Sequence, residues 1–151
     1  LARWEKSPPI VGVLGADFIR AFKFVRISLA GRYLVLSATT EYPGTPAQVA
    51  AVPLVDKNGG LAVEAMVDGN KETIILDIAG DFEIANGAPA PGTIRQVSIG
   101  DVVFRQVESV PGAEIGLGLD PGFRIGRQLL EKYDLVFNNY GKQLILERPP
   151  R

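Results

Sequence analysis

The 151-residue sequence contains neither cysteine nor histidine. Without cysteine the chain has no disulfide framework and no thiolate nucleophile. Without histidine it lacks the base that usually assists serine and cysteine nucleophiles, and it lacks the commonest zinc ligand. The sequence therefore excludes the usual histidine-dependent catalytic sites, and we expect it to hold no metal and no cofactor.

An excess of charge and a long apolar run are also missing. The formal net charge is −1, which gives no electrostatic reason to expect a nucleic acid as partner. No apolar stretch approaches the ~18 residues that would cross a bilayer, so we expect no membrane span. The chain begins with Leu1 rather than methionine, and we expect it to be a piece of a longer protein.

The central stretch of the chain is an apolar run that ends in a carboxylate. Ile74-Ile75-Leu76-Asp77 is followed directly by Ile78-Ala79-Gly80. The run predicts a buried strand, and Ala79-Gly80 predicts a tight turn at its end. Asp77 would then lie between strand and loop, where an unpaired carboxylate is costly to desolvate. Two explanations are open: the side chain caps its own turn, or it handles protons in acid–base chemistry.

Around this stretch, the pattern of apolar, glycine and proline residues predicts mostly strands. Residues 16–24 have the spacing of a helix, with Asp17 placed to cap its start, and residues 37–48 are the best candidate for a linker. Residues 49–77 predict a three-stranded meander that ends on Asp77. The other expected elements are a strand at 10–15, a hairpin at 24–36, a loop at 86–92, a strand–turn–strand unit at 97–104, a helix at 123–132, and strands at 133–137 and 142–147.

One order of elements occurs twice in the chain. A glycine-containing apolar segment, a helix and a hairpin follow one another from Val13 to Leu36, and again from Gly116 to Leu146. Repeats of this size usually mark duplicated structural units. Two unrelated pieces with the same element order are the alternative.

Three of these segments resemble the retropepsin-like (acid protease) family, the half-size relatives of the pepsins. Ile75-Leu76-Asp77-Ile78-Ala79 resembles the family's Asp-Thr/Ser-Gly segment, and residues 114–120 resemble its second pattern of two apolar residues and glycine. Residues 133–137 with 141–144 resemble its closing strands. The resemblance implies a mostly β, acid-protease-like closed barrel with one or two short helices over residues 49–151. Residues 1–48 would be a linker plus a partial repeat, the C-terminal part of a preceding unit.

The resemblance also implies an aspartic endopeptidase, a hydrolase, with Asp77 as a catalytic residue. It predicts that the strand ending at Leu76 lies beside a strand at Ile115–Leu119. The sequence departs from the family in three places: Ile78 has no hydroxyl to tie the active-site loops together, Ala79 replaces glycine, and the interval from Asp77 to the turn at 98–100 leaves little room for a flap.

Aspartic proteolysis needs two carboxylates that share one proton. Asp17 and Asp120 follow the apolar-glycine patterns, and we interpret both as helix N-caps. Asp81 is a local alternative. On this interpretation, the second carboxylate comes from a missing N-terminal half or from another copy of the chain.

Three functions are open at this point. The chain is an aspartic-peptidase-like enzyme acting on an extended peptide or protein, or a non-catalytic peptide-binding or assembly module with the same fold, or an unrelated β-barrel with a small-molecule site. Residues 1–36 are apolar but lack the rest of a domain, so we expect them to pack on residues 49–151, on a partner fragment or in a homodimer.

Overall fold

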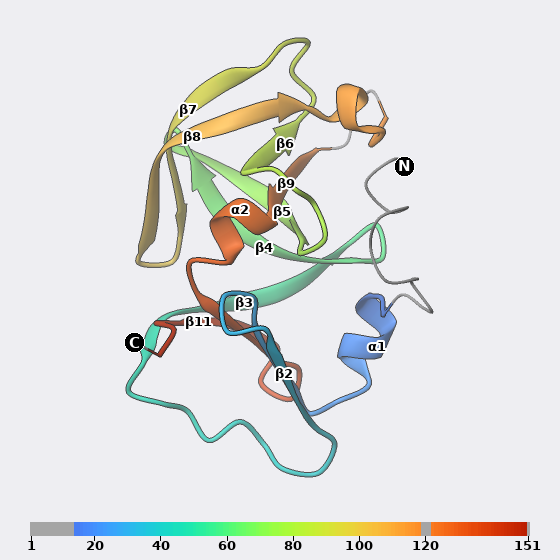
Figure 1. Cartoon of the computed structure of the whole chain (residues 1–151), viewed down its shortest axis with the longest axis vertical. Helices are drawn as coiled ribbons and strands as arrows, with labels where there is room; N and C mark the ends of the chain where they lie inside the picture. Colours follow the sequence, from blue (N-terminus) through green and yellow to red (C-terminus); the bar gives the residue numbers. More distant parts are fainter. Residues whose placement is uncertain (1–13, 119–121, 151) are drawn as a thin grey trace.

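Strands dominate the computed structural model, which describes residues 14–118 and 122–150 (Figure 1). The strands are β1 (Phe24–Ser28), β2 (Tyr33–Ser37), β3 (Gln48–Lys57), β4 (Gly60–Val67), β5 (Asn70–Asp77), β6 (Ile84–Asn86), β7 (Gly92–Ile99), β8 (Val102–Pro111), β9 (Phe123–Gly126), β10 (Asp134–Asn138) and β11 (Gln143–Glu147). The helices in these ranges are α1 (Ala16–Arg20), the 3-10 helix η2 (Gly112–Ile115) and α2 (Arg127–Leu130). The predicted class, mostly β with short helices, is confirmed.

Six strands close into a barrel. Their order is β4-β5-β9-β6-β8-β7, and β7 returns to β4 through the pairs Met66↔Ser98 and Val67↔Val97. Alternate residues of these strands point inward and form a continuous apolar core with residues of β10 and β11. The closed barrel expected for residues 49–151 is therefore present.

The predicted meander is formed by β3, β4 and β5. Lys57 pairs with Gly60 and Val67 pairs with Asn70, so each connection contains two residues. Asn58-Gly59 and Asp68-Gly69 fill them, and all four residues have positive φ. This is the conformation of a type I′ hairpin, for which Asn-Gly and Asp-Gly are the preferred sequences.

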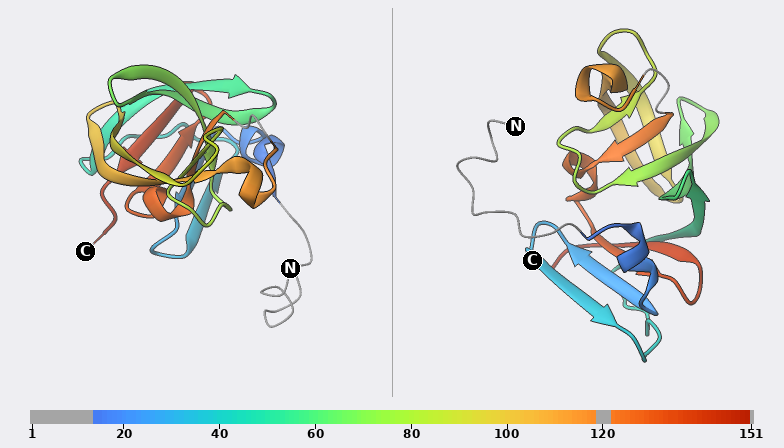
Figure 2. Two further views of the ribbon diagram at one scale, coloured as in Figure 1. Left: turned by 90° about the horizontal axis from the view of Figure 1, so that it is seen from above. Right: turned by 90° about the vertical axis from the view of Figure 1, so that its right-hand side faces the viewer.

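A four-stranded sheet, β2-β1-β10-β11, continues from the barrel through β3. The first half of β3 pairs with β11, and its second half pairs with β4. Figure 2 shows the barrel above and the hairpin β1–β2 below it, with β10 and β11 between them. The N-terminal hairpin therefore belongs to the same sheet as the C-terminal hairpin.

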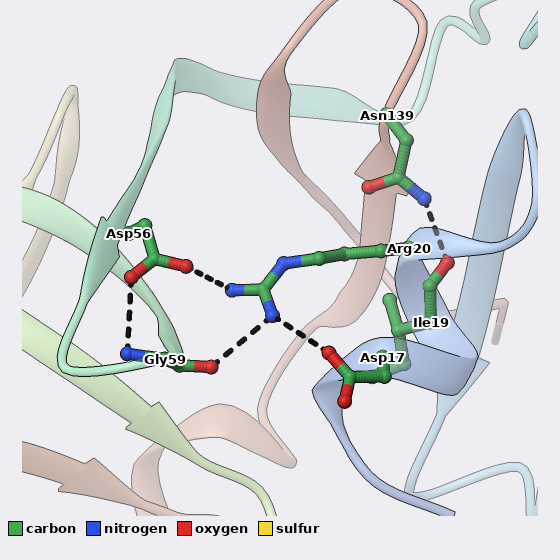
Figure 3. Close-up of polar contacts among 6 residues, drawn as sticks. All are labelled: Asp17, Ile19, Arg20, Asp56, Gly59 and Asn139. Carbon is green, nitrogen blue, oxygen red and sulfur yellow. Dashed lines mark hydrogen bonds and ion pairs between the residues drawn. The ribbon is translucent and has the colours of Figure 1, made fainter.

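Polar contacts join helix α1 and the residues after it to the β3–β4 turn and to Asn139 (Figure 3). The Arg20 guanidinium donates to Asp56 Oδ2 at 2.6 Å and to the Gly59 carbonyl at 3.1 Å, which ties α1 to the β3–β4 turn. The Asn139 side-chain amide donates to the carbonyl of Ile19 at 2.8 Å and to that of Phe22 at 2.9 Å. Residues 16–37 thus pack on the body of the same chain, which is one of the arrangements expected for them.

Four expectations about local structure are wrong. Asp17 does not cap α1, because the N-cap is Gly15 and Asp17 lies in the first turn. The first helix ends at Arg20 rather than at residue 24. The loop expected at 86–92 is shorter at both ends, because Asn86 ends β6 and Gly92 begins β7. The helix expected at 123–132 spans only Arg127–Leu130, since residues 123–126 form β9. Residues 10–13 of the strand expected at 10–15 lie outside the described ranges, as does Asp120.

No helix in the described part of the chain is long and apolar enough to span a bilayer.

Candidate active site

Asp77 is the last residue of β5, where a buried strand gives way to a loop. Ile74, Ile75 and Leu76 before it are buried, whereas the Asp77 side chain retains 21% of its exposure. The turn that follows is closed by backbone atoms, because the Gly80 amide donates to the Asp77 carbonyl at 3.1 Å. The Asp77 side chain lies close to Gly80 of this turn, and a capping role for its carboxylate stays a prediction.

The loop after Asp77 is held against β9 and α2 by three backbone hydrogen bonds. The Arg127 amide donates to the Gly80 carbonyl at 2.8 Å, the Gly126 amide to the Glu83 carbonyl at 2.9 Å, and the Gln128 amide to the Phe82 carbonyl at 3.2 Å. The approach is close enough that a Cβ on Gly126 would collide with the Phe82 carbonyl oxygen. The glycine at position 126 thus allows the loop after Asp77 to pack closely against the start of α2.

The strand beside Asp77 is β9 and not the predicted segment Ile115–Leu119. β5 and β9 run parallel, and Asp77 is paired with Gly126. Ile115 ends the 3-10 helix η2 and residues 116–118 belong to no strand, so the prediction of a paired strand at Ile115–Leu119 is wrong over its described residues. Ile115 and Leu117 nevertheless line a shallow hollow together with Asp77 and Asp81. Strand β9, which ends in Ile125-Gly126, takes the place beside β5 that was predicted for Ile115–Leu119.

Asp77 and Asp81 each lie near a guanidinium group. The Asp77 carboxylate is 3.8 Å from the Arg124 guanidinium, too far for a direct hydrogen bond but close enough for an ion pair. Asp81 accepts hydrogen bonds from Arg127 at 2.7 Å and from Gln128 at 3.2 Å. Asp81 is therefore engaged by two side chains at the start of α2.

A larger hollow of about 460 Å³ is also lined by Asp77, and it lies between the barrel and the N-terminal unit. Its walls are mainly apolar side chains from α1, β1 and β5, and Asp77 and Arg124 are the charged residues among them. Leu34 of β2 and Gly15 before α1 also line it. The candidate site is thus one carboxylate and one guanidinium at the edge of an apolar hollow.

The hairpin β7–β8 does not cover Asp77. The far end of β8, at Ser109 and Pro111, pairs with β6 near the Asp77 loop. Its turn lies at the opposite end of β8, where Gly100 lies close to Ala50 and Val52. A ten-residue strand spans roughly 30 Å. Residues 87–91 are all that connect β6 to β7, so no hairpin is placed above Asp77 within the described residues.

The described residues contain no cluster of acidic, histidine or cysteine side chains that could hold a metal ion.

Sequence reasoning missed Arg124, Phe82 and Gly126 as parts of this site. A signal for Gly126 was available, since Ile125-Gly126 precedes the second helix as Leu14-Gly15 precedes the first. Nothing in the local sequence indicates the approach of Arg124, because it depends on the parallel pairing of β9 with β5.

No protein-family model matches the sequence, and a search of curated proteins finds no significant match. Among solved structures, the chain is similar to the crystal structure of a retropepsin-like aspartic protease from Rickettsia conorii. The two share 20% sequence identity at a TM-score of 0.48, and the match covers 66% of this chain and 90% of that chain.

Proposed function

We propose that this chain is an aspartic-peptidase-like module that holds one carboxylate, Asp77, of a two-carboxylate site. The observation that carries the proposal is the placement of Asp77. It ends a buried strand of a closed barrel, lies beside a parallel strand that ends in glycine, and opens onto a hollow. The residues that resemble the family's Asp-Thr/Ser-Gly segment thus lie at an accessible strand end.

Peptide hydrolysis by such a site requires a second carboxylate. One carboxylate activates water while its protonated partner donates to the peptide carbonyl. The charged neighbour of Asp77 among the described residues is Arg124, and Asp81 is engaged with Arg127. The second carboxylate therefore comes from another polypeptide half or another copy of the chain, and the substrate is an extended peptide or protein.

A second candidate function is a non-catalytic peptide-binding or assembly module. Three observations favour it. Arg124 already supplies a counter-charge to Asp77, and the connection at residues 87–91 is too short to form a flap over the site. Ile78 also lacks the hydroxyl that the resemblance would require. For the 151-residue chain alone, this second function is the one that we favour.

The domain division belongs to the same proposal. We assign residues 49–151 to the acid-protease-like unit and residues 1–48 to the end of a preceding unit plus a linker. The support is that α1, β1 and β2 follow one another as α2, β10 and β11 do.

Substitution of Asp77 separates the two functions. If Asp77 is catalytic and another copy of the chain supplies the second carboxylate, the purified chain cleaves an unfolded protein at about pH 4, and Asp77→Asn lowers the rate at least about 100-fold. Asp81→Asn, in the same hollow, is the matched control and should retain activity. Either variant should keep the fold, because partly exposed ion pairs contribute about 1 kcal/mol or less.

Absence of cleavage by the wild-type chain, even at high protein concentration, would exclude another copy of the chain as the source of the second carboxylate. It would leave either a separate polypeptide half as that source or the non-catalytic module as the function. Cleavage that survives Asp77→Asn would overturn the assignment of Asp77 in either case.

A further inference from the structure

Strands β5 and β9 present one carboxylate and one guanidinium on the same face. In their parallel pairing Ile75 lies opposite Arg124, and Asp77 lies two residues further along β5. Because side chains alternate between the two faces of a strand, Ile75, Asp77 and Arg124 lie on one side. Ile74 and Leu76 alternate with them and belong to the apolar core. The face with Asp77 and Arg124 is therefore the outer face of the barrel, and it lines the 460 Å³ hollow.

The other walls of this hollow are apolar. Helix α1 contributes Phe18 and Ile19, β1 contributes Val25 and Ile27, and Leu34 of β2 also lines it. A volume of about 460 Å³ lies within the range of roughly 300–1,000 Å³ that small-molecule sites occupy. Burial of an apolar group there is favourable because it removes apolar surface from water. The hollow can therefore hold an apolar side chain next to the two charges.

The guanidinium has hydrogen-bond donors that the described protein does not use. Its distance of 3.8 Å from the Asp77 carboxylate leaves no direct hydrogen bond between the two groups. The Nε atom of Arg124 is buried and has no hydrogen-bond partner among the described residues. A buried donor without a partner is unfavourable and calls for an explanation. The two side chains retain 29% and 21% exposure, so a ligand in the hollow can reach both charges.

A ligand that matches this arrangement carries an ammonium, a carboxylate and an apolar group on one small skeleton. A carboxylate accepts paired hydrogen bonds from a guanidinium, and an ammonium donates charge-assisted hydrogen bonds to a carboxylate. In an α-amino acid both charged groups are attached to one carbon, so they are close neighbours as Arg124 and Asp77 are. A ligand with a carboxylate alone would place a second negative charge beside Asp77, and one with an ammonium alone a second positive charge beside Arg124.

We propose that the hollow binds a free α-amino acid with an apolar side chain, such as leucine or phenylalanine. Arg124 binds its carboxylate, Asp77 binds its ammonium, and the apolar walls hold its side chain. The inference goes beyond the proposed function, from which it takes only the accessible position of Asp77. It needs no second carboxylate, and it holds whether or not the chain cleaves peptides.

A series of leucine derivatives tests the role of each charge. We expect isothermal titration calorimetry of the full 151-residue chain at neutral pH to show leucine binding with a Kd of about 1 mM or below. N-acetylleucine lacks the ammonium and leucinamide lacks the carboxylate, so each should bind at least about tenfold more weakly. N-acetylleucinamide has the same side chain and neither charge, and it should bind more weakly still. Glutamate and lysine should not bind, because the apolar walls would desolvate their charged side chains.

Two variants connect each charge of the ligand to one residue. Arg124→Leu should weaken leucine binding at least about tenfold without weakening that of leucinamide, which has no carboxylate to lose. Asp77→Asn should likewise weaken binding of leucine but not of N-acetylleucine. Arg105→Leu is the matched control, since Arg105 is an exposed arginine of another barrel strand that donates to Gln96 and does not line the hollow. Circular dichroism shows whether each variant is folded.

The proposal is overturned if leucine does not bind the folded wild-type chain, or if Arg124→Leu and Arg105→Leu weaken binding equally. It is also overturned if N-acetylleucinamide binds as tightly as leucine, because the hollow would then be a site for an apolar group of a peptide. The ligand series on the wild-type chain decides the matter even where a variant does not fold. Because binding is measured without cleavage, failure of the proposed peptidase-like function would not change these outcomes.

Discussion

Gly126 and Gly15 have the same backbone conformation but different neighbours. Gly126 has φ −97° and ψ 178°, and Gly15 has φ −93° and ψ −172°, so both are extended and accessible to any residue. The distinction between them is space, since a Cβ on Gly126 would collide with Phe82. The requirement for glycine before α2 therefore comes from the packing of the Asp77 loop and not from backbone strain.

We expect Gly126→Ala to destabilise the protein by about 1–3 kcal/mol, because a backbone carbonyl must move to admit the methyl group. Gly15→Ala is the matched control and should change stability by less than about 0.5 kcal/mol. Urea denaturation followed by circular dichroism measures both. Equal effects of the two substitutions would contradict the packing that we describe at Gly126.

At this scale the sequence predicted Asp77 but not its partners. An aspartate that ends an apolar run is visible in one segment of eight residues. Arg124 and Gly126 lie more than forty residues further along the chain, and only the pairing of β5 with β9 brings them to Asp77. The interpretation of Asp17 as an N-cap failed because the helix has its N-cap at Gly15, two residues earlier than Asp17.

The four strands of the terminal sheet share a cluster of polar side chains, most of it buried. Arg26 of β1 lies 2.9 Å from Asp134 of β10 and 3.0 Å from Glu147 of β11. Tyr33 of β2 donates to Asp134 at 3.0 Å, and Thr45 donates to Glu147 at 2.7 Å. The Arg26 guanidinium thus forms ion pairs with two fully buried carboxylates, and the cluster joins both hairpins of the sheet.

Burial raises the pKa of Glu147 above its ordinary value, and the Arg26 charge opposes this rise without cancelling it. The folded protein therefore holds a proton on Glu147 more readily than the unfolded chain does. Its contribution to the free energy of unfolding is fully present below the ordinary glutamate pKa, and it is lost as the pH rises through the raised pKa.

We expect Glu147→Gln to remove this pH dependence. The melting temperature of the wild type minus that of the variant should be larger at about pH 4 than at about pH 7. Glu64→Gln, at an exposed glutamate paired with Lys71, controls for the loss of one surface charge. A difference in melting temperature that stays constant with pH would show that Glu147 does not titrate between these values.

At the scale of elements, the sequence predicted the strands and turns that have a local sequence pattern. It missed the strands that form through pairing with distant segments. The hairpins and the meander were predicted because Asn-Gly and Asp-Gly turns and alternating residues are visible in short windows. β6 and β9 were missed because they have only three and four residues, too few for a visible pattern. Their extended conformation depends on pairing with strands that are distant in the sequence. The apolar spacing of Ile125, Leu129 and Leu130 fits a helix, but the pairing of β9 with β5 keeps residues before Arg127 extended.

For the whole molecule, the two hairpin units depend on one another. Val25 of β1 and Leu135 and Phe137 of β10 are fully buried, and they lie in adjacent strands of one sheet. The order of elements allowed the sequence to predict that residues 1–36 need the body. It could not predict the contact itself, which joins positions more than one hundred residues apart.

A chain that begins at Val49 tests this dependence. Removal of β1 leaves the edge of β10 unpaired and uncovers Leu135 and Phe137, which now have no exposure to solvent. An unpaired apolar edge promotes association with other chains. We therefore expect the shortened chain to aggregate or to change its oligomeric state in size-exclusion chromatography with light scattering. Addition of a peptide spanning residues 14–40, which contains α1, β1 and β2, should restore the original elution, whereas a scrambled peptide should not. A shortened chain that stays a soluble monomer with an unchanged melting temperature would mean that β1 is an accessory strand, and that the barrel with β10 and β11 forms a complete core without it.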